Sequence, residues 1–226
     1  MKLSVIIASY NEAKTLRKCI DGIYSKNPDM ELEVILADDG STDDTTKLVK
    51  TFNYPDFKYV RHAFNKGKGS AIKMGLSFAT GDIIIIQDAD LEYDPADYKK
   101  LIAPILEGKA EVVYGSRILN GENKKAGIIF YVGGRFLSWF TNLLYGSSIT
   151  DEPTCYKVFK KEIIKNLDLK SRGFEFCPEV TAKILKQKIR IYEVPISYNP
   201  RSIAEGKKIK FSDGLKAIWT LIKYRL

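Results

Sequence analysis

The stretch that decides the fold is IIIIQDADLE, residues 83–92, in which an uncharged isoleucine run ends in acidic side chains two residues apart. Four consecutive β-branched residues indicate a strand that is buried on both faces of a sheet. In open α/β sheets, ligands lie beyond the carboxyl ends of the strands. We therefore expect Asp88, Asp90 and Glu92 to hold a divalent cation, Mg²⁺ or Mn²⁺, because both ions prefer hard oxygen ligands. A strand end with solvated acids is the alternative interpretation.

Segments with the pattern of strands alternate with segments of helical period around this stretch. Strands are expected at residues 3–8, 33–37, 58–61, 82–87, 110–115 and 190–195. Helices are expected at residues 12–24, 42–52, 71–78, 98–107, 126–146, 174–186 and 211–226. This order predicts an α/β fold with a mainly parallel central sheet flanked by helices, wound as in nucleotide-binding folds.

Composition limits the class of protein and its partners. The 226 residues, with 45% hydrophobic and 28% charged side chains, suit a globular chain of one or two domains. Three cysteines without metal-ligand spacing argue against a disulfide framework and favour a reducing compartment. The net charge of +8 is compatible with nucleic acid, a membrane surface or a phosphorylated ligand. We expect no nucleic acid, because no such module is present and the acidic strand end would repel a phosphate backbone.

Two other predicted strands also end in polar residues, namely SYNE at 9–12 and DDGS at 38–41. Their place beside the acidic strand end is that of a nucleotide pocket. Tyr10 can cover a base, and Glu12 or Asp39 can accept hydrogen bonds from a base or a ribose. The sequence lacks GxGxxG after its first strand and lacks GxxxxGK[ST], which argues against a dinucleotide dehydrogenase and a phosphate-loop hydrolase.

With these motifs, the chain resembles the family 2 glycosyltransferases of the GT-A fold, and most of all their polyprenyl- or dolichyl-phosphate hexose synthases. The matching motifs follow one another along nearly the whole chain: SYNE, DDGSTD at 38–43, NKGKG at 65–69, DADL at 88–91, GSR at 115–117, Asp151 with Thr154 and Tyr156, and Arg201 with Gly206 and Lys207-Lys208. The resemblance implies a GT-A type nucleotide-diphospho-sugar transferase fold in a single catalytic domain, 1–226. Its nucleotide-sugar-binding half would be 1–117 and its acceptor-facing half 118–226.

The resemblance and the residue types together give a set of expected site residues. The nucleotide sugar would be contacted by Ala8, Tyr10, Asn11, Glu12, Asp39, Lys66, Asp88, Ala89 and Asp90. The metal would be held by Asp88, Asp90 and Glu92, the last at a position where mannosyl relatives often carry glutamine. The acceptor phosphate would be held by Arg117, Arg135, Arg201, Lys207 and Lys208, although relatives often have Ser-Lys in place of the two lysines. The residues expected to be catalytic are Asp88, Asp90, Arg117 and Asp151.

The implied reaction is an in-line, inverting hexosyl transfer from GDP-mannose or UDP-glucose to a polyprenyl or dolichyl phosphate. The metal would stabilise the charge that develops on the leaving nucleoside diphosphate. A phosphate acceptor needs cations and no general base, whereas a sugar or protein hydroxyl would need one. Asp151 could be that base, a substrate-positioning acid or a helix cap. Lys66 and Lys68, between glycines, could touch phosphates or lie in a solvated loop. A non-catalytic nucleotide-sugar or lipid-phosphate binding module is the third interpretation of the chain.

Two segments bear on membrane contact. The apolar stretch 126–145 carries Arg135 and Asn142 near its middle, which argues against a membrane span and favours a place on a membrane or in a groove. Its aromatic stripe of Phe136, Trp139 and Phe140 with Leu143 has helical spacing, for which core packing is the default expectation. Residues 211–226 form a basic amphipathic pattern. No signal peptide is expected, since the N-terminus has the pattern of a first strand. We expect a peripheral enzyme on the cytoplasmic membrane face, with a helix packed on the domain as the alternative. A homo-oligomer or a membrane-protein partner is left open.

Overall fold

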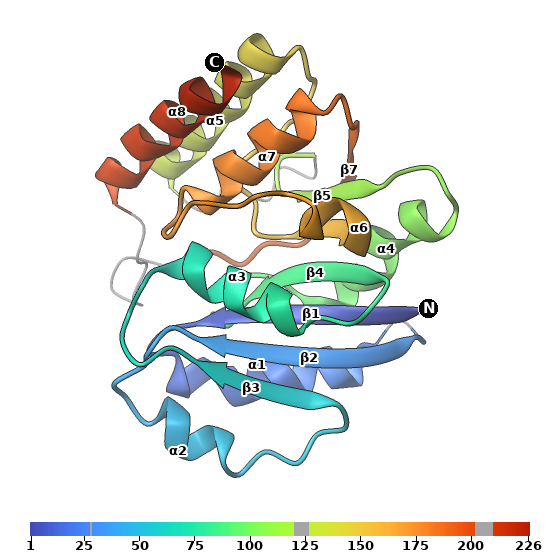
Figure 1. Ribbon diagram of the computed structural model, residues 1–226, viewed down its shortest axis with the longest axis vertical. Helices are drawn as coiled ribbons and strands as arrows, with labels where there is room; N and C mark the ends of the chain where they lie inside the picture. Colours follow the sequence, from blue (N-terminus) through green and yellow to red (C-terminus); the bar gives the residue numbers. More distant parts are fainter. Residues whose placement is uncertain (28, 120–126, 202–209) are drawn as a thin grey trace.

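The computed structural model describes residues 1–27, 29–119, 127–201 and 210–226 (Figure 1). Its centre is a sheet with the strand order β3-β2-β1-β4-β6-β5-β7. Strand β6 runs antiparallel to its neighbours β4 and β5, and the other pairings are parallel. The strands are β1 (Lys2–Ser9), β2 (Glu31–Asp38), β3 (Phe57–Arg61), β4 (Ile83–Asp88), β5 (Val112–Ser116), β6 (Lys157–Lys160) and β7 (Ile191–Pro195). The predicted mainly parallel sheet is confirmed.

Helices cover both faces of the sheet. In Figure 1, α3 lies in front of β1 and α1 lies behind the sheet, whereas α5, α7 and α8 pack together at the upper end of the molecule. The isoleucines of β4 are buried between these layers, as predicted. The helices are α1 (Ala13–Ser25), α2 (Thr45–Val49), α3 (Lys68–Phe78), α4 (Tyr98–Leu106), α5 (Ile128–Tyr145), α6 (Lys161–Lys165), α7 (Phe176–Lys186) and α8 (Phe211–Arg225), with a 3₁₀ turn, η1, at Pro95–Asp97.

Strand β6 was not predicted, because a four-residue segment that begins and ends with lysine shows no strand alternation. Lys157 is fully buried in this strand. Its Nζ donates to the carbonyl of Glu152 at 2.6 Å and lies 3.6 Å from the ring centre of Tyr114. A hydrogen bond and an aromatic face thus stabilise the buried ammonium group of Lys157, and the local sequence reveals neither of them.

Helix α2 begins three residues later than the predicted residue 42, because residues 41 and 42 are held by other hydrogen bonds. The Oγ of Ser41 donates to Asp38 at 2.6 Å, and the backbone N–H of Thr42 donates to Oδ1 of Asn11 at 2.8 Å. These bonds hold residues 41–43 against the ends of β1 and β2. The helix therefore starts at Thr45, after Asp44.

The exposed face of α5 is the one that the sequence assigned to the core. Phe136, Trp139 and Leu143 are 45%, 57% and 65% exposed, so the prediction that this stripe packs in the core is wrong. The buried face of the helix is polar and carries Ser138 and Thr141. Ser138 accepts a hydrogen bond from the backbone of residue 152 at 2.9 Å, which explains why a polar face can pack inward. Among the described helices, none combines the length and the hydropathy that crossing a bilayer requires.

Helix α8 packs on the domain with one face and exposes the other. Ala217 and Leu221 are buried where the helix packs on α5 and α7. Leu215 and Trp219 remain exposed on the other side. The C-terminal helix is thus packed on the domain and still presents an apolar face.

The end of the sheet opposite the acidic strand end is held by a buried carboxylate, Glu33. It accepts hydrogen bonds from Ser4 Oγ, from Lys58 Nζ at 2.8 Å and from the backbone N–H groups of Thr80 and Gly81 at 2.6 and 2.9 Å. Burial by itself would raise the pKa of Glu33, but these donors outweigh it and lower the pKa from 4.5 to about 2.

A depressed folded-state pKa means that stabilisation by Glu33 is complete above about pH 4.5 and is lost as pH falls toward 2. We expect Glu33→Gln to lower the free energy of unfolding by about 1–3 kcal/mol at pH 7, because buried donors lose their charged acceptor. The variant should also lose less stability than the wild type between pH 5 and pH 3, as measured by urea unfolding. A residual slope is expected from Glu179, whose pKa is also about 2. Parallel pH curves for the two proteins would contradict this assignment.

Candidate active site

Six parallel strands bring their carboxyl ends to one edge of the sheet. Ala8 of β1 is in register with Ala37 of β2 and Asp88 of β4, and Ser116 of β5 with Pro195 of β7. The chain runs from β1 outward through β2 and β3 and then crosses to β4 on the other side of β1. Such a switch in strand order is where open α/β sheets bind ligands. The predicted polar strand ends therefore meet at one place.

Arg201 forms ion pairs with three acidic residues at this edge of the sheet. Its Nη2 lies 2.7 Å from Oδ2 of Asp90, and its Nη1 lies 3.4 Å from Oε2 of Glu12. Its Nε lies 3.4 Å from Oε1 of Glu92, and its backbone N–H donates to the same oxygen at 3.1 Å. One predicted nucleotide contact (Glu12), two predicted metal ligands (Asp90 and Glu92) and one predicted acceptor-phosphate residue (Arg201) thus form one cluster. Their segments follow β1, β4 and β7.

A second basic side chain, Lys68, forms an ion pair with Asp88. The Nζ of Lys68, from the first turn of α3, is 2.6 Å from Oδ1 of Asp88. Burial opposes the charge of Lys68, but Asp88 and its neighbours raise its pKa well above the ordinary value. Lys66, which we had expected near the phosphates, is exposed, and its Nζ lies 5.3 Å from the ring centre of Phe64. The NKGKG motif contains two lysines, Lys66 and Lys68. Only Lys68, the first residue of α3, contacts an acid at the end of β4.

The acids at the end of β4 are largely buried and repel one another electrostatically. Burial, followed by the negative charges of Asp88 and Glu92, raises the pKa of Asp90 to about 7, while Arg201 opposes the shift. Asp88 and Asp90 offer the hard oxygens that suit Mg²⁺ or Mn²⁺, and a metal would take over the role that Lys68 and Arg201 have here. The described residues include no group of three or more His, Cys, Asp or Glu side chains arranged around a metal position. One or two carboxylates completed by substrate phosphates is the usual arrangement for Mg²⁺.

Asp39, a predicted nucleotide contact just after β2, makes hydrogen bonds within the protein that hold the loop before α3. Asp39 is buried, and its carboxylate accepts from the backbone N–H groups of Lys66 and Gly67 at 2.9 and 2.7 Å and lies 2.9 Å from His62 Nδ1. Gly67 has φ +101°, and a Cβ there would lie 2.4 Å from the carbonyl oxygen of Arg172. Asp39 therefore shapes the glycine loop, which only glycine at 67 allows.

The other predicted nucleotide contacts line the same edge. Ala8 ends β1 beside Asp88, Tyr10 is partly buried just beyond it, and Ala89 is buried between the two aspartates. Asn11 adopts φ +54° and uses its side-chain oxygen to hold residues 42 and 43. These positions thus lie at the same end of the sheet as the acids.

Arg117 and Asp151 form a buried, two-pronged ion pair. Nε and Nη2 of Arg117 each lie 2.8 Å from an oxygen of Asp151, and the backbone N–H of Arg117 donates to Oδ2 at 2.9 Å. Glu193 in turn accepts from the backbone N–H groups of Thr150 and Asp151 at 2.7 and 3.0 Å. Both oxygens of Asp151 are thus engaged, which favours the positioning role over that of a general base.

Tyr198 connects this ion pair to the acidic cluster. The guanidinium carbon of Arg117 lies 5.0 Å from the centre of the Tyr198 ring. The Tyr198 hydroxyl donates to Oε2 of Glu92 at 2.9 Å. Tyr198 and Glu193 were not among the predicted site residues, because nothing in their local sequence distinguishes them from packing or surface positions. Lys68 lies in the NKGKG motif, which indicated a possible phosphate contact without deciding between its two lysines.

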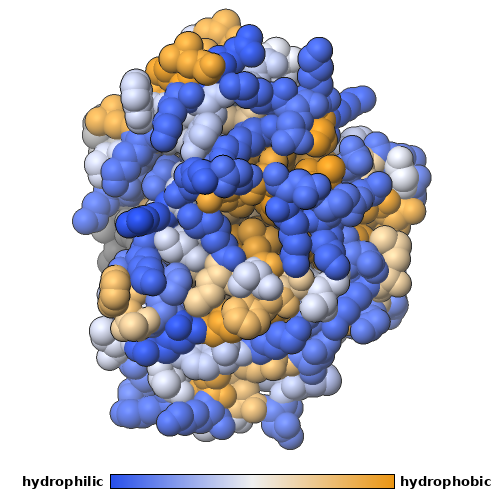
Figure 2. Space-filling view, in the orientation of Figure 1, coloured by the Kyte–Doolittle hydropathy of each residue, from blue (hydrophilic) through white to orange (hydrophobic). Residues whose placement is uncertain are grey.

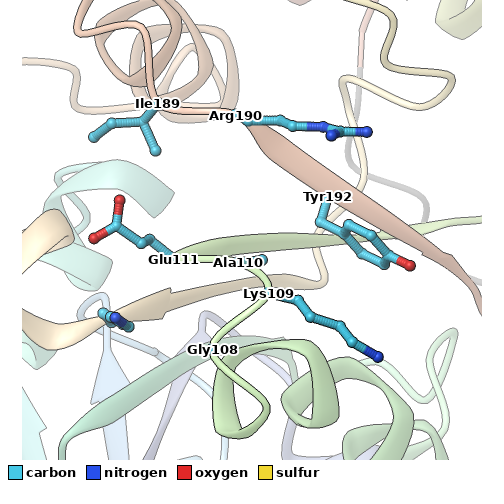
Figure 3. Close-up of a pocket in the computed structure, with 8 residues that line it drawn as sticks. Gly108, Lys109, Ala110, Glu111, Ile189, Arg190 and Tyr192 are labelled. Atoms are coloured by element: carbon cyan, nitrogen blue, oxygen red, sulfur yellow. The ribbon is translucent and has the colours of Figure 1, made fainter.

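Of the remaining predicted acceptor residues, only Arg135 is among the described residues. Arg135 is exposed on α5, outside the network of contacts that the described residues form around Arg117 and Arg201. Lys207 and Lys208 lie outside the described residues. A hollow of about 370 Å³ is lined by Lys109, Lys160, Arg190 and Tyr192, among others (Figure 3). It opens where β5 and β7 begin, at the opposite end of these strands from the acids, and so is not the site described here.

Residues 4–168 match the family model described as Glycosyl transferase family 2. The chain belongs to this family. It is 32% identical over 244 residues to the UDP-N-acetylglucosamine–dolichyl-phosphate N-acetylglucosaminyltransferase of Methanococcus voltae, covering 98% of this chain and 95% of that protein. It is 30% identical over 233 residues to the dolichol-phosphate mannosyltransferase of Pyrococcus furiosus, covering 99% of this chain and 64% of that protein.

The fold of this family 2 enzyme is also that of solved glycosyltransferases. The structure of glucosyl-3-phosphoglycerate synthase from Mycobacterium tuberculosis, in complex with Mn²⁺, UDP and glucosyl-3-phosphoglycerate, superposes with a TM-score of 0.76. The two share 19% sequence identity, and the match covers 99% of this chain and 79% of that one. At this identity the likeness concerns the fold, and it confirms the predicted GT-A type.

Proposed function

We propose that this enzyme is a metal-dependent, inverting hexosyltransferase that moves a sugar from GDP-mannose or UDP-glucose to a polyprenyl or dolichyl phosphate. The observation that carries the proposal is the pair Arg117–Asp151, in which a buried carboxylate fixes a guanidinium near the acidic strand end. A guanidinium fork suits phosphate oxygens. The relatives from Methanococcus voltae and Pyrococcus furiosus, whose names specify dolichyl or dolichol phosphate, support the same acceptor class.

In the proposed reaction, an oxygen of the acceptor phosphate attacks the anomeric carbon from the side opposite the nucleoside diphosphate. The new carbon–oxygen bond forms as the bond to the diphosphate breaks, so the configuration inverts. A bound divalent cation supplies stabilisation of the charge on the departing diphosphate. Asp88 and Asp90 would hold that cation, while Arg117 and Arg201 would bind and orient the attacking phosphate.

A hydroxyl acceptor is less well supported. It would require a base that removes a proton during attack, and Asp151 already uses both carboxylate oxygens on Arg117. A phosphate is an anion before it reacts, so it needs no such group. Membership of an enzyme family likewise disfavours a non-catalytic binding module.

Transfer of labelled sugar to a short polyprenyl phosphate tests this function. GDP-mannose, UDP-glucose and UDP-N-acetylglucosamine should be compared, each with and without Mn²⁺, since the named relatives differ in the sugar that they transfer. We expect one donor to give a Mn²⁺-dependent product that extracts into chloroform and is labile to mild acid. Donor binding without any lipid product from all three donors would contradict the proposed acceptor.

We further propose that the enzyme meets its lipid acceptor as a peripheral protein at the cytoplasmic membrane face. Hydrophobic surface is visible at the upper end of the molecule in Figure 2, the end where Figure 1 places α5 and α8. We define the apolar face as the exposed side chains of these helices: Ile128, Ile129, Val132, Phe136, Trp139, Leu143, Leu215 and Trp219. Exposed basic residues 216, 223 and 225 of α8 accompany it. Apolar side chains beside basic ones are typical of helices that lie in a headgroup region.

The double variant Trp139→Ser, Leu143→Ser is expected to bind anionic vesicles at least tenfold more weakly than the wild type. Burial of one large apolar side chain is worth about 1.5–3 kcal/mol, so losing two should be readily measurable. Co-sedimentation at low salt measures the binding. Leu106→Ser serves as the matched control, because Leu106 is 51% exposed at the end of α4, outside the apolar face. Equal losses in both variants, or a wild type that does not sediment with vesicles, would contradict the proposal.

A further inference from the structure

We propose that Glu152 is an uncharged carboxylic acid at neutral pH, and that in this form it positions Asp151, and through it Arg117, for the acceptor phosphate. The identity of that phosphate rests on the proposed function. Glu152 and Asp151 are adjacent in the chain, but their surroundings give the two acids different charges and different tasks.

The carboxyl group of Glu152 is fully buried and has little to stabilise a negative charge. The residue is 0% exposed, and within the described part of the chain its Oε2 has no hydrogen-bond partner. Its Oε1 lies 3.1 Å from the hydroxyl oxygen of Thr181 in α7. A buried carboxylate needs an opposite charge or several donors to replace the water that it loses. The neutral acid avoids this penalty.

The two basic groups nearest to Glu152 are engaged elsewhere. Nζ of Lys157 donates to the backbone carbonyl of Glu152 at 2.6 Å and lies 3.6 Å from the ring centre of Tyr114. The guanidinium of Arg117 bonds to both oxygens of Asp151. Burial therefore raises the pKa of Glu152, and the charge of Asp151 adds to the rise, whereas the two cations oppose it without reversing it.

The hydrogen bonds around Thr181 also favour a proton on Glu152. Oγ1 of Thr181 lies 3.1 Å from Oε1 of Glu152, 2.9 Å from the carbonyl oxygen of Cys177 and 3.0 Å from the hydroxyl of Tyr114. A threonine hydroxyl has one proton and two acceptor positions. All three contacts are satisfied when Thr181 donates to the carbonyl and receives protons from Tyr114 and Glu152. With Glu152 ionised, Thr181 would face two acceptors with one proton.

Glu152 fastens the loop that carries Asp151 to three elements. Its backbone N–H donates to Ser138 of α5 at 2.9 Å, its carbonyl accepts from β6, and its side chain contacts Thr181 of α7. Asp151 is the preceding residue and holds the guanidinium of Arg117. The direction of that guanidinium therefore depends on how Glu152 is held, and a phosphate bound by it is sensitive to its direction.

The absence of charge on Glu152 also preserves the field of Arg117. A negative Glu152 would add to the charge of Asp151 and weaken the attraction of the guanidinium for a phosphate. The uncharged acid keeps the loop attached without that effect. The other titratable groups that face Glu152 are the hydroxyl of Tyr114 from β5 and the thiol of Cys177 from α7, and burial raises the pKa of both.

Infrared difference spectroscopy of the full-length protein tests the charge of Glu152. The carbonyl stretch of a protonated carboxylic acid lies apart from the carboxylate bands and shifts in D₂O. We expect the wild type minus Glu152→Gln spectrum at pH 7 to contain this band. Glu33→Gln is the matched control, because Glu33 is also fully buried but has a pKa of about 2, so its difference spectrum should lack the band.

The pH dependence of stability should have opposite signs for the two buried acids. A folded-state pKa above the unfolded value stabilises the protein most below the unfolded value, and this contribution is lost as pH rises. The wild type should therefore lose stability relative to Glu152→Gln between pH 5 and pH 7 in urea unfolding. At pH 7 Glu152→Gln should unfold at the same or a higher urea concentration than the wild type, whereas Glu33→Gln should unfold at a lower one.

The positioning role is tested by the KM for a short polyprenyl phosphate. Glu152→Gln, whose amide can donate to Thr181 as the acid does, should stay within twofold of the wild type at pH 7. Glu152→Ala, which loses this contact, should raise the acceptor KM about tenfold and leave the donor KM within twofold. Because the alanine variant can also lose stability, its KM is measured where urea unfolding shows it to be folded.

Two kinds of result would overturn the inference. A difference spectrum without the carboxylic acid band, or a loss of stability in Glu152→Gln equal to that in Glu33→Gln, would show that Glu152 is ionised. An unchanged acceptor KM in Glu152→Ala, or an equal rise in Glu152→Gln, would show that an uncharged Glu152 does not position Arg117. If the wild type transferred no sugar to the lipid phosphate, the proposed function and the positioning role would fail together, and the infrared spectrum would still decide the charge.

Discussion

Asp90→Asn is expected to reduce kcat by about a thousandfold or more while leaving the fold intact. The substitution preserves the volume of the side chain but removes the charge with which Asp90 would bind a divalent cation. A loss of this size corresponds to about 4 kcal/mol of transition-state stabilisation, a reasonable share for a metal that neutralises a leaving diphosphate. The amide can still accept from the N–H of Glu92, so the turn at Leu91 should survive.

Initial rates of sugar transfer at saturating donor measure the effect, with thermal unfolding as the check on folding. Asp82→Asn is the control, because Asp82 immediately precedes the same strand at its opposite end and is exposed, where it accepts from the backbone N–H of Lys2. The control should retain activity within about twofold. An Asp90→Asn enzyme that kept more than a tenth of wild-type activity would show that the metal assignment is wrong.

Asp151→Asn should be the second most damaging change, through both stability and acceptor binding. The buried guanidinium of Arg117 would lose its two-pronged anionic partner, and breaking a buried pair in this way costs about 3–5 kcal/mol. We expect a fall of about a hundredfold in kcat/KM for the acceptor, because Arg117 would no longer be held in place. Donor and Mn²⁺ binding should be retained, since neither involves this pair.

The companion variant Arg117→Lys separates positioning from base catalysis. It keeps a cation and leaves Asp151 in place but removes the planar fork. If Asp151 positions Arg117, the two variants should raise the acceptor KM to a similar degree. A general base would give a different result, namely loss of kcat in Asp151→Asn with normal stability, and near-normal kcat in Arg117→Lys. Urea unfolding and acceptor titrations distinguish the two cases.

The sequence was sufficient for the sheet and for the acidic end of β4. Isoleucine runs between polar strand ends predict buried parallel strands, and parallel strands place their carboxyl ends together. The positions of Asp39, Asp88 and Asp90 followed from that pattern alone. Strand β6 was missed because its buried Lys157 depends on Glu152 and Tyr114, whose spatial closeness a local pattern cannot show.

The connections within the site were not predictable, because they join residues far apart in the chain. Arg201 reaches Asp90 across more than a hundred positions, and Arg117 meets Asp151 and Tyr198 only in the folded protein. The apolar stripe of α5 was misassigned for a related reason. Helical spacing shows that such residues share a face, but it does not show whether that face meets the core or the outside.

The central claim is that the acceptor is an anionic phosphate held by arginines. It is tested most directly by offering the enzyme a short polyprenyl phosphate and the corresponding polyprenyl alcohol, with the same labelled donor and Mn²⁺. We predict Mn²⁺-dependent transfer to the phosphate and none to the alcohol, because Asp151, the expected base for a hydroxyl, already uses both carboxylate oxygens on Arg117. Transfer to the alcohol at a rate equal to or above that for the phosphate would contradict the account.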